Sequence, residues 1–187
     1  MDSSRATRQP TEADLPRATE RLEETFARCQ NELFGTLYYV VGNAEDARDA
    51  VQETFVKCWR HRQEVPEIEN LRAWIFRIAI NTGRDLRSTA WRRRRVPLEK
   101  GDATLEVTQS EPETGDPQTE ASRREELALV RQAVLHLRPE EQEVFLLRQN
   151  GEMTYDQIAA SMKIPVGTVK TRMRLAITKL RGALEGK

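Results

Sequence analysis

The stretch from Gly151 to Leu180 restricts the fold more than any other part of the sequence, because two helix-forming patterns there are separated by only a few residues. The first begins with Thr154 to Gln157, which has the form of a capping box: the threonine hydroxyl accepts from the first turn and the glutamine reaches back. The residues Lys163, Ile164 and Pro165 end that pattern, and Pro165 suits the start of another helix, where the N–H that proline lacks is not needed. Two helices joined by such a short turn predict a helix-turn-helix.

The second helix of this stretch has an apolar face and a basic face. We expect the apolar face to comprise Val169, Met173, Ile177, Leu180 and Leu184. At about 100° per residue, the opposite face presents Thr171, Arg174, Leu175 and Thr178, with Lys170 and Arg172 on its two sides. A DNA-recognition helix is organised in this way, since its outer residues reach base edges and its flanking cations reach phosphates. A solvated basic face is the alternative, but the cap, the turn and the apolar face together favour DNA binding.

The charges of the chain are segregated although its formal net charge is zero, with 30 cationic and 30 acidic residues. The segment 84–95 has six arginines and one acid, and the segment 163–187 has seven cations and one acid. Between them, the segment 99–120 has seven acids and one lysine. This distribution indicates two surfaces that meet polyanions, joined by a segment that avoids or imitates them.

Helical periodicity also organises the first half of the chain. One helix is expected to begin near Thr19 and to bury Leu22, Phe26, Cys29, Leu33 and Leu37. The next, which opens at Asn43 or Ala44, is expected to bury Ala47, Val51, Phe55 and Cys58. Its other face would expose Asp49, Gln52, Glu53, Val56 and Arg60. A break is expected from 64 to 69, because Pro66 disfavours helix in the residue before it.

A third helix is expected from about Asn70 to Trp91. Its buried face would comprise Leu71, Trp74, Ile75, Ile78, Thr82 and Leu86. Its other side would present Arg77, Ile80, Arg84 and Arg87, before the basic run 91–95. Arginines interspersed with rings such as Phe76 and Trp91 are typical of a surface for melted nucleic acid, whereas Trp74 is also explained as a core residue. A pocket for a base would lie in the preceding loop, 62–70.

These patterns predict an all-α chain with two small helical domains. With 187 residues, of which 32% are charged, the chain suits two small cores better than one large one. We divide it into a flexible arm at 1–20, a helical domain at 21–96, an acidic linker at 97–120 and a second helical domain at 121–187. The linker assignment follows from its prolines, its acids and its lack of large apolar residues.

Other classes of protein are disfavoured by features that the sequence lacks. It has neither a signal-peptide core nor a run of about 18 apolar residues, so we expect a cytoplasmic protein without membrane insertion. Cys58 and His61 have ligand-like spacing, but no second pair follows them, so no metal is expected. Neither a glycine-rich phosphate loop nor a Ser/His/Asp set is present, so we expect no cofactor and no enzymatic activity.

Three longer motifs occur in a specific order: DARDAVQETFVKCWRH, NLRAWIFRIAINTGRDLRS and LRPEEQEVFLLRQNGEMTYDQIAASMKIPVGTVKTRM. With the acidic segment between the second and the third, the chain resembles a bacterial RNA polymerase sigma factor of the extracytoplasmic-function (ECF) subgroup of the sigma-70 family. The resemblance covers residues 24–96 and 122–184 and implies two domains, region 2 and region 4. It implies a factor that binds core polymerase, recognises the minus-ten and minus-thirty-five promoter elements, and promotes DNA melting.

The resemblance also implies roles for individual residues. Asp49, Gln52, Glu53, Val56 and Arg60 would dock on the clamp helices of the largest polymerase subunit. The minus-ten element would meet the loop 62–70 together with Trp74, Arg77, Asn81, Arg84 and Arg87. The minus-thirty-five element would meet Lys170, Thr171, Arg172 and Arg174, beside the flap of the second-largest subunit. An anti-sigma factor is a further implied partner, and the acidic linker would thread the polymerase channel.

The alternative interpretation is a helix-turn-helix transcriptional regulator with an N-terminal sensor or interaction domain. Such a regulator needs a pocket-forming sensor fold, and residues 24–95 look too short and too helical for one. Co-purification with core polymerase would separate the two interpretations.

Overall fold

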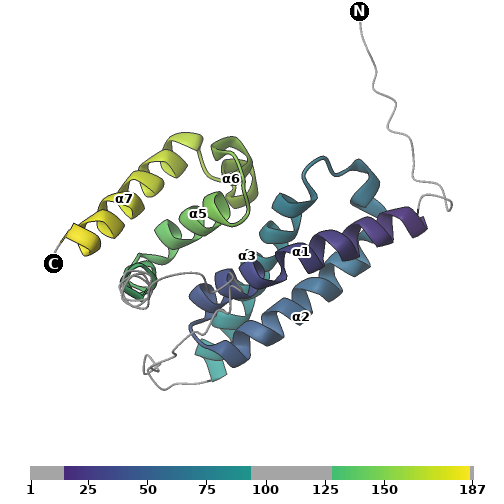
Figure 1. Ribbon diagram of the computed structural model, residues 1–187, viewed down its shortest axis with the longest axis horizontal. Helices are drawn as coiled ribbons and strands as arrows, with labels where there is room; N and C mark the ends of the chain where they lie inside the picture. Colours follow the sequence, from purple (N-terminus) through teal and green to yellow (C-terminus); the bar gives the residue numbers. More distant parts are fainter. Residues whose placement is uncertain (1–14, 94–127, 186–187) are drawn as a thin grey trace, which may run out of the picture.

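The structure is a computed structural model that describes residues 15–93 and 128–185 (Figure 1). Its elements are α1 (Leu15–Val41), α2 (Ala44–Arg60), the 3-10 helix η2 (Arg62–Glu67), α3 (Leu71–Arg93), α5 (Pro139–Gln149), α6 (Tyr155–Met162) and α7 (Val166–Glu185). A further helical stretch covers 128–135, and the described residues contain no strand, in agreement with the predicted all-α class. The first 14 residues, the predicted linker 97–120 and the side chains of the basic run 91–95 lie outside the described residues.

Helices α1 and α2 are joined by a tight turn. Gly42 adopts a φ of 92°, which favours glycine, and Asn43 caps α2 by accepting a hydrogen bond from the Asp46 N–H at 2.8 Å. All five residues predicted for the buried face of α1 are buried. The helix begins earlier than predicted, at Leu15, and buries Ala18 as well. Local capping and apolar periodicity therefore define this helix pair.

The predicted break before α3 contains a short helix. Pro66 lies inside η2, because the φ of about −65° that proline fixes is also the φ of a 3-10 helix. Val65 of this turn is fully buried. Arg21 of α1 holds the segment in place by donating to the carbonyl oxygens of Val65, at 3.2 Å, and Ile68, at 3.0 Å.

Helix α3 is buried on two sides, although we predicted one. The expected face is inside, with Leu71, Trp74, Ile75 and Thr82 buried and Ile78 and Leu86 half-buried. The prediction that Ile80 is exposed is wrong, because its side chain is 2% exposed. Ile80 shares a second face with three residues that recur every four positions: Arg72, Phe76 and Arg84. Residues 143–152 contact this face, which explains its burial.

The C-terminal unit, residues 128–185, contains the predicted helix-turn-helix. The capping box at the start of α6 is present, and Lys163 ends the helix in a left-handed conformation with φ 55°. The predicted apolar face of α7 is partly wrong, because Ile177 is 41% exposed and Leu184 is 43% exposed. Ala176 is fully buried instead, in a cluster with Val134.

The C-terminal unit packs against the N-terminal unit, residues 15–93. Helix α5 lies against both α1 and α3 (Figure 1). Asn150 donates its side-chain N–H to the buried Thr36 hydroxyl at 2.9 Å, and a Cβ on Gly151 would lie 3.2 Å from the Cβ of Phe76. One apolar cluster includes Leu33 of α1 and Leu147 of α5. The described helices therefore share a continuous core.

Candidate nucleic-acid interface and docking face

The geometry of the helix-turn-helix is set by local contacts. The Thr154 hydroxyl accepts from the Gln157 N–H at 3.2 Å, and the Gln157 side chain accepts from the Thr154 N–H at 2.9 Å. These reciprocal bonds satisfy donors that the first turn of α6 would otherwise leave unpaired. After the turn at Lys163, α7 continues for 20 residues. The turn thus places a long helix beside a short one that is well capped.

The outer face of α7 has the predicted composition. Lys170, Thr171, Arg174, Leu175 and Thr178 are exposed, and Arg172 is half-buried. Two of the hydroxyl groups bond to their own helix: Thr171 donates to the Gly167 carbonyl at 3.0 Å, and Thr178 donates to the Arg174 carbonyl at 2.9 Å. The face therefore combines cations, methyl groups and one leucine in an arrangement that can lie in a DNA groove.

The residues predicted for the minus-ten element do not form one exposed surface. Arg77 and Asn81 are exposed on α3. Trp74 is 8% exposed and belongs to the core of the N-terminal unit. Arg87 is half-buried and donates to the Val40 carbonyl at 3.4 Å. Arg84 points to the C-terminal unit, so the structure brings only two of the five residues together on a free surface.

Arg84 is paired with a glutamate that the sequence analysis missed. Its Nε donates to Oε1 of Glu143 at 2.8 Å, and its Nη2 donates to Oε2 of the same carboxylate. The hydrogen bond from the guanidinium to Glu143 raises the pKa of Arg84 above its ordinary value, although burial opposes this. A detectable signal was the presence of Phe76 and Ile80 on a face that we expected to be solvated.

Arg72 makes a second contact between the units, and the sequence analysis missed it too. Its Nε donates to the Asn150 carbonyl at 2.8 Å, and it lies within ion-pair distance of Glu152, at 3.4 Å, and Glu32, at 3.7 Å. The guanidinium also stacks over Phe76, with its carbon 5.1 Å from the ring centroid. These groups continue the contact that Arg84 makes farther along α3.

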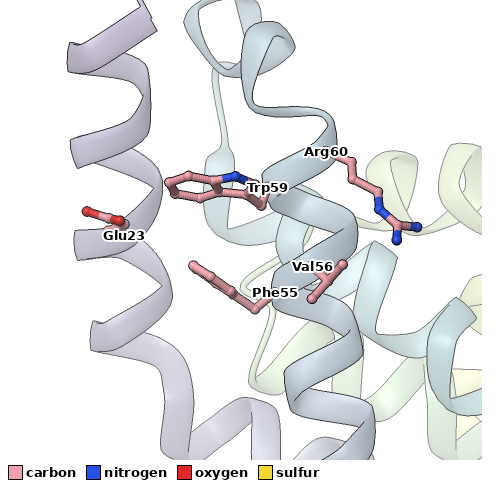
Figure 2. A pocket seen from close by; sticks show the side chains of 5 residues that line it. All are labelled: Glu23, Phe55, Val56, Trp59 and Arg60. Atoms are coloured by element: carbon pink, nitrogen blue, oxygen red, sulfur yellow. The ribbon is translucent and has the colours of Figure 1, made fainter.

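The predicted docking face on α2 is accessible. Asp49, Gln52, Val56 and Arg60 are exposed, and Glu53 is half-buried. An apolar hollow of about 310 Å³ adjoins it, lined by Glu23, Phe55, Val56, Trp59 and Arg60 (Figure 2). Phe55 packs on Phe26 of α1 with ring centroids 5.1 Å apart. Trp59, which the sequence analysis did not single out, makes this face partly apolar.

Other kinds of site find no support in the described part of the chain. No group of three or more His, Cys, Asp or Glu residues is placed to hold a metal ion there. No helix in residues 15–93 and 128–185 is long and apolar enough to cross a membrane. Both cysteines are buried and free, and burial raises the pKa of Cys29 to about 11 and that of Cys58 to about 12.

Family models match both halves of the chain. The model described as "Sigma-70 region 2" matches residues 25–95, and the model described as "Sigma-70, region 4" matches residues 127–180. The first match spans α1 to α3, with the candidate docking face. The second spans α5, α6 and most of α7, with the helix-turn-helix.

Two curated relatives are similar over most of their length. The ECF RNA polymerase sigma-E factor of Salmonella typhimurium is 32% identical over 149 residues, which cover 76% of this chain and 73% of the relative. The RNA polymerase sigma-H factor of Pseudomonas aeruginosa is 29% identical over 164 residues, 83% of this chain and 82% of the relative.

Solved structures share the fold at lower identity. The sigma factor RpoE in complex with the anti-sigma factor NepR from Bartonella quintana is 23% identical, with a TM-score of 0.60 over 89% of this chain and 96% of that chain. CnrH in complex with the cytosolic domain of CnrY is 24% identical, with a TM-score of 0.59 over 92% of this chain and 96% of that chain.

Proposed function

Because the chain belongs to the sigma-70 family of RNA polymerase sigma factors, in its ECF subgroup, we propose a role in transcription initiation for each of its surfaces. A sigma factor binds core RNA polymerase, recognises the minus-ten and minus-thirty-five promoter elements and promotes melting, and it catalyses no reaction itself. Residues 21–96 act on polymerase and the minus-ten element, and residues 121–187 act on the minus-thirty-five element. The acidic segment 97–120 connects them.

Polymerase docks on the exposed face of α2. The face joins polar groups, Gln52 and Arg60 among them, to the apolar hollow beside Trp59. A partner helix that presents one apolar side chain between polar ones fits such a surface. Its apolar side chain fills the hollow, and its polar side chains pair with the polar groups of α2 around the hollow. The clamp helices of the largest polymerase subunit are the partner that we assign to Asp49, Gln52, Glu53, Val56 and Arg60.

The minus-ten element is opened and read by α3 and the segment before it. Arg77 and Asn81 are exposed on one side of α3 and can reach separated strands. Arg84 and Arg87 lie farther along the helix, and they would add positive charge for the phosphates once released from Glu143 and from the Val40 carbonyl. Trp74 is a core residue in the described arrangement, so its contact with DNA requires α3 to be exposed further.

The minus-thirty-five element is read by the outer face of α7. Thr171 and Arg174 are placed to reach base edges, and Lys170 and Arg172 are placed to reach phosphates on either side. Leu175 is 40% exposed beside them and suits either a thymine methyl group or the flap of the second-largest polymerase subunit.

The chain also binds an anti-sigma factor. Two solved structures with its fold contain a second protein. In one, the sigma factor RpoE is bound to the anti-sigma factor NepR, and in the other, CnrH is bound to the cytosolic domain of CnrY. A partner of this class would act in the cytoplasm, where the polymerase is. It would compete with polymerase by covering one of the two candidate surfaces, the α2 face or the outer face of α7.

The observation that carries the proposal is the presence, on one chain, of an exposed α2 face beside an apolar hollow and of an exposed basic face on α7. The test is a reconstituted transcription assay with purified core polymerase, which initiates at promoters only when a sigma factor is supplied. Adding the chain should give promoter-dependent transcripts from a library of candidate promoters. Binding to DNA without binding to core polymerase would support the alternative of a helix-turn-helix regulator.

A further inference from the structure

The segment 62–70, between α2 and α3, is fixed at both ends by short-range contacts. At its start, Arg62 donates to the Trp59 carbonyl at 3.0 Å, and its guanidinium carbon lies 5.1 Å from the centroid of the Trp59 ring. At its end, the Asn70 side chain accepts from the Ala73 N–H at 2.9 Å and so caps α3. These contacts position the two ends of the segment but do not reach its middle.

The middle of the segment is a turn, residues 65–68, that carries exposed side chains on a buried anchor. Val65 is fully buried in the core, whereas Pro66 and Glu67, which follow it, are exposed. The turn is closed by its own backbone, because the Val65 carbonyl accepts from the Ile68 N–H at 3.2 Å. Burial of one side chain fixes where the turn lies, and a second attachment is needed to fix its orientation.

Arg21 of α1 supplies this second attachment. One terminal nitrogen of its guanidinium donates to the Val65 carbonyl at 3.2 Å, and the other donates to the Ile68 carbonyl at 3.0 Å. The two carbonyls stand on either side of the exposed pair Pro66 and Glu67 in the chain. A planar guanidinium holds two acceptors in a fixed relation to each other, which a single ammonium group does not. Arg21 therefore fixes the direction in which Pro66 and Glu67 face.

Arg21 is itself exposed, so a direct contact with a DNA phosphate is the alternative role for this side chain. A phosphate contact needs positive charge at this place, whereas orienting the turn needs two donors in a fixed geometry. Lysine keeps the charge and loses the fork. The substitution Arg21→Lys therefore separates the two roles.

We propose that Arg21 is a positioning residue for the minus-ten element, because it orients the turn 65–68 so that Pro66 and Glu67 meet an unpaired base. The inference rests on the proposed function, which assigns the segment before α3 to this element. A base taken out of the stack is recognised by stacking and by hydrogen bonds, and the groups that make them must be held in place. Pro66 offers such a base an apolar surface, and the Glu67 carboxylate offers a hydrogen-bond acceptor.

The experiment measures base preference with reconstituted polymerase on promoters in which the minus-ten and minus-thirty-five elements are randomised separately. The variants are Arg21→Ala and Arg21→Lys, and the matched control is Arg17→Ala, an exposed arginine one turn earlier on α1. Both Arg21 variants should reduce the preference at one position of the minus-ten element roughly fivefold, the effect of losing a charge-assisted hydrogen bond. Both should leave the minus-thirty-five preference unchanged. Arg17→Ala should change neither preference.

Two further measurements separate positioning from a general effect on folding. The affinity for labelled core polymerase should be unchanged in both Arg21 variants, because the candidate docking face belongs to α2. On a promoter that is already melted at the minus-ten element, the preference should remain relaxed, because the defect lies in reading the base and not in separating the strands. Circular dichroism shows whether each variant is folded, and Arg21→Lys decides the matter if Arg21→Ala does not fold.

An unchanged minus-ten preference in the folded Arg21 variants would overturn the proposal. A preference that is lost with Arg21→Ala and kept with Arg21→Lys would overturn it too, because charge alone would then suffice. Equal losses at both promoter elements would assign Arg21 to folding instead. All three results leave promoter-dependent transcription by the original chain intact. Failure of the original chain to direct such transcription would overturn the proposed function, and this inference with it.

Discussion

Gly83 of α3 lies directly against Val40 of α1, so closely that a Cβ on the glycine would be 2.8 Å from Cγ1 of the valine and 3.0 Å from Cδ2 of Leu37. The two helices approach each other here because the glycine has no side chain. This close approach fixes the position of α3 and of the arginines that it presents.

Gly83→Ala should therefore destabilise the protein although alanine is the better helix former. Alanine favours the helix by about 1 kcal/mol, whereas overpacking costs about 1 to 3 kcal/mol, so we expect a net loss of up to about 2 kcal/mol. Gly35→Ala is the control, since nothing lies within 4 Å of its Cβ position, and it should stabilise by about 0.5 to 1 kcal/mol. Urea unfolding measures both. If the Gly83→Ala protein is as stable as the Gly35→Ala protein, α1 can shift to make room for the new Cβ without a cost in stability.

Gln52→Ala combined with Glu53→Ala should weaken the binding of core polymerase by roughly tenfold, because both residues belong to the proposed docking face. A pull-down measures the affinity, and circular dichroism measures the helix content. Glu45→Gln, an exposed change in the same helix outside this face, should leave binding unchanged. Loss of binding together with loss of helicity would assign Gln52 and Glu53 to the stability of α2.

Removal of Arg77 and Arg84 should impair melting. Cations on α3 stabilise separated strands, so open complexes should decrease more on a duplex promoter than on one that is already melted. Permanganate footprinting on the two templates measures this difference. An equal loss on both would assign the arginines to polymerase contact or to general electrostatics.

Arg174→Ala and Arg172→Ala should have different effects. A bidentate pair with guanine is worth roughly 1 to 3 kcal/mol of discrimination, so Arg174→Ala should relax the preference at one position of the minus-thirty-five element. A phosphate contact has no sequence preference, so Arg172→Ala should weaken binding to all DNA sequences alike. It should also reduce the slope of log affinity against log salt concentration by about one. A randomised element, transcribed at two salt concentrations, tests both. An unchanged preference with Arg174→Ala would exclude this residue from base reading.

The buried cysteines predict a loss of stability at high pH. The folded protein raises the pKa of Cys29 from 9.0 to about 11 and that of Cys58 from 9.0 to about 12. The stabilisation is complete below pH 9 and is lost as the pH rises toward 11 and 12, because only the unfolded chain releases these protons there. Each thiol contributes a slope of up to about 1.4 kcal/mol per pH unit.

Urea unfolding between pH 8 and pH 11 measures this slope. The free energy of unfolding should depend less steeply on pH in the variant with Cys29→Ala and Cys58→Ala. Tyr38 and Tyr39 contribute to the slope that remains, because burial also raises their pKa values. Equal slopes in the two proteins would show that the thiols ionise without unfolding.

The sequence predicted the elements whose determinants are local. Asn43 and Thr154 cap their helices through bonds to residues three positions away, so the caps could be read from a few letters. The apolar face of α1 was also predictable, because large residues recur there at helical spacing. The exposure of Thr171, Arg174, Leu175 and Thr178 on α7 followed from the same periodicity.

The remaining features depend on which helices meet. Ile80 is buried and Arg84 contacts the C-terminal unit, and the only sign of a second buried face in α3 was the apolar pair Phe76 and Ile80, which does not identify the element that covers it. In α7 we predicted Ile177 on the apolar face, yet it is Ala176 that is buried, in the cluster with Val134. The partner of Arg84 lies 59 residues away along the chain, beyond the reach of any local pattern.

The hydroxyl of Thr171 has only one proton, and that proton is already committed to the Gly167 carbonyl of its own helix. Toward the major groove, the side chain can therefore offer only oxygen lone pairs and a methyl group. Adenine and cytosine present amino groups there, whereas the exposed oxygens of guanine and thymine would need a donor. Under the proposed reading of the minus-thirty-five element, the base preference at the position of Thr171 would thus be set inside the protein, by an intrahelical bond that never touches DNA.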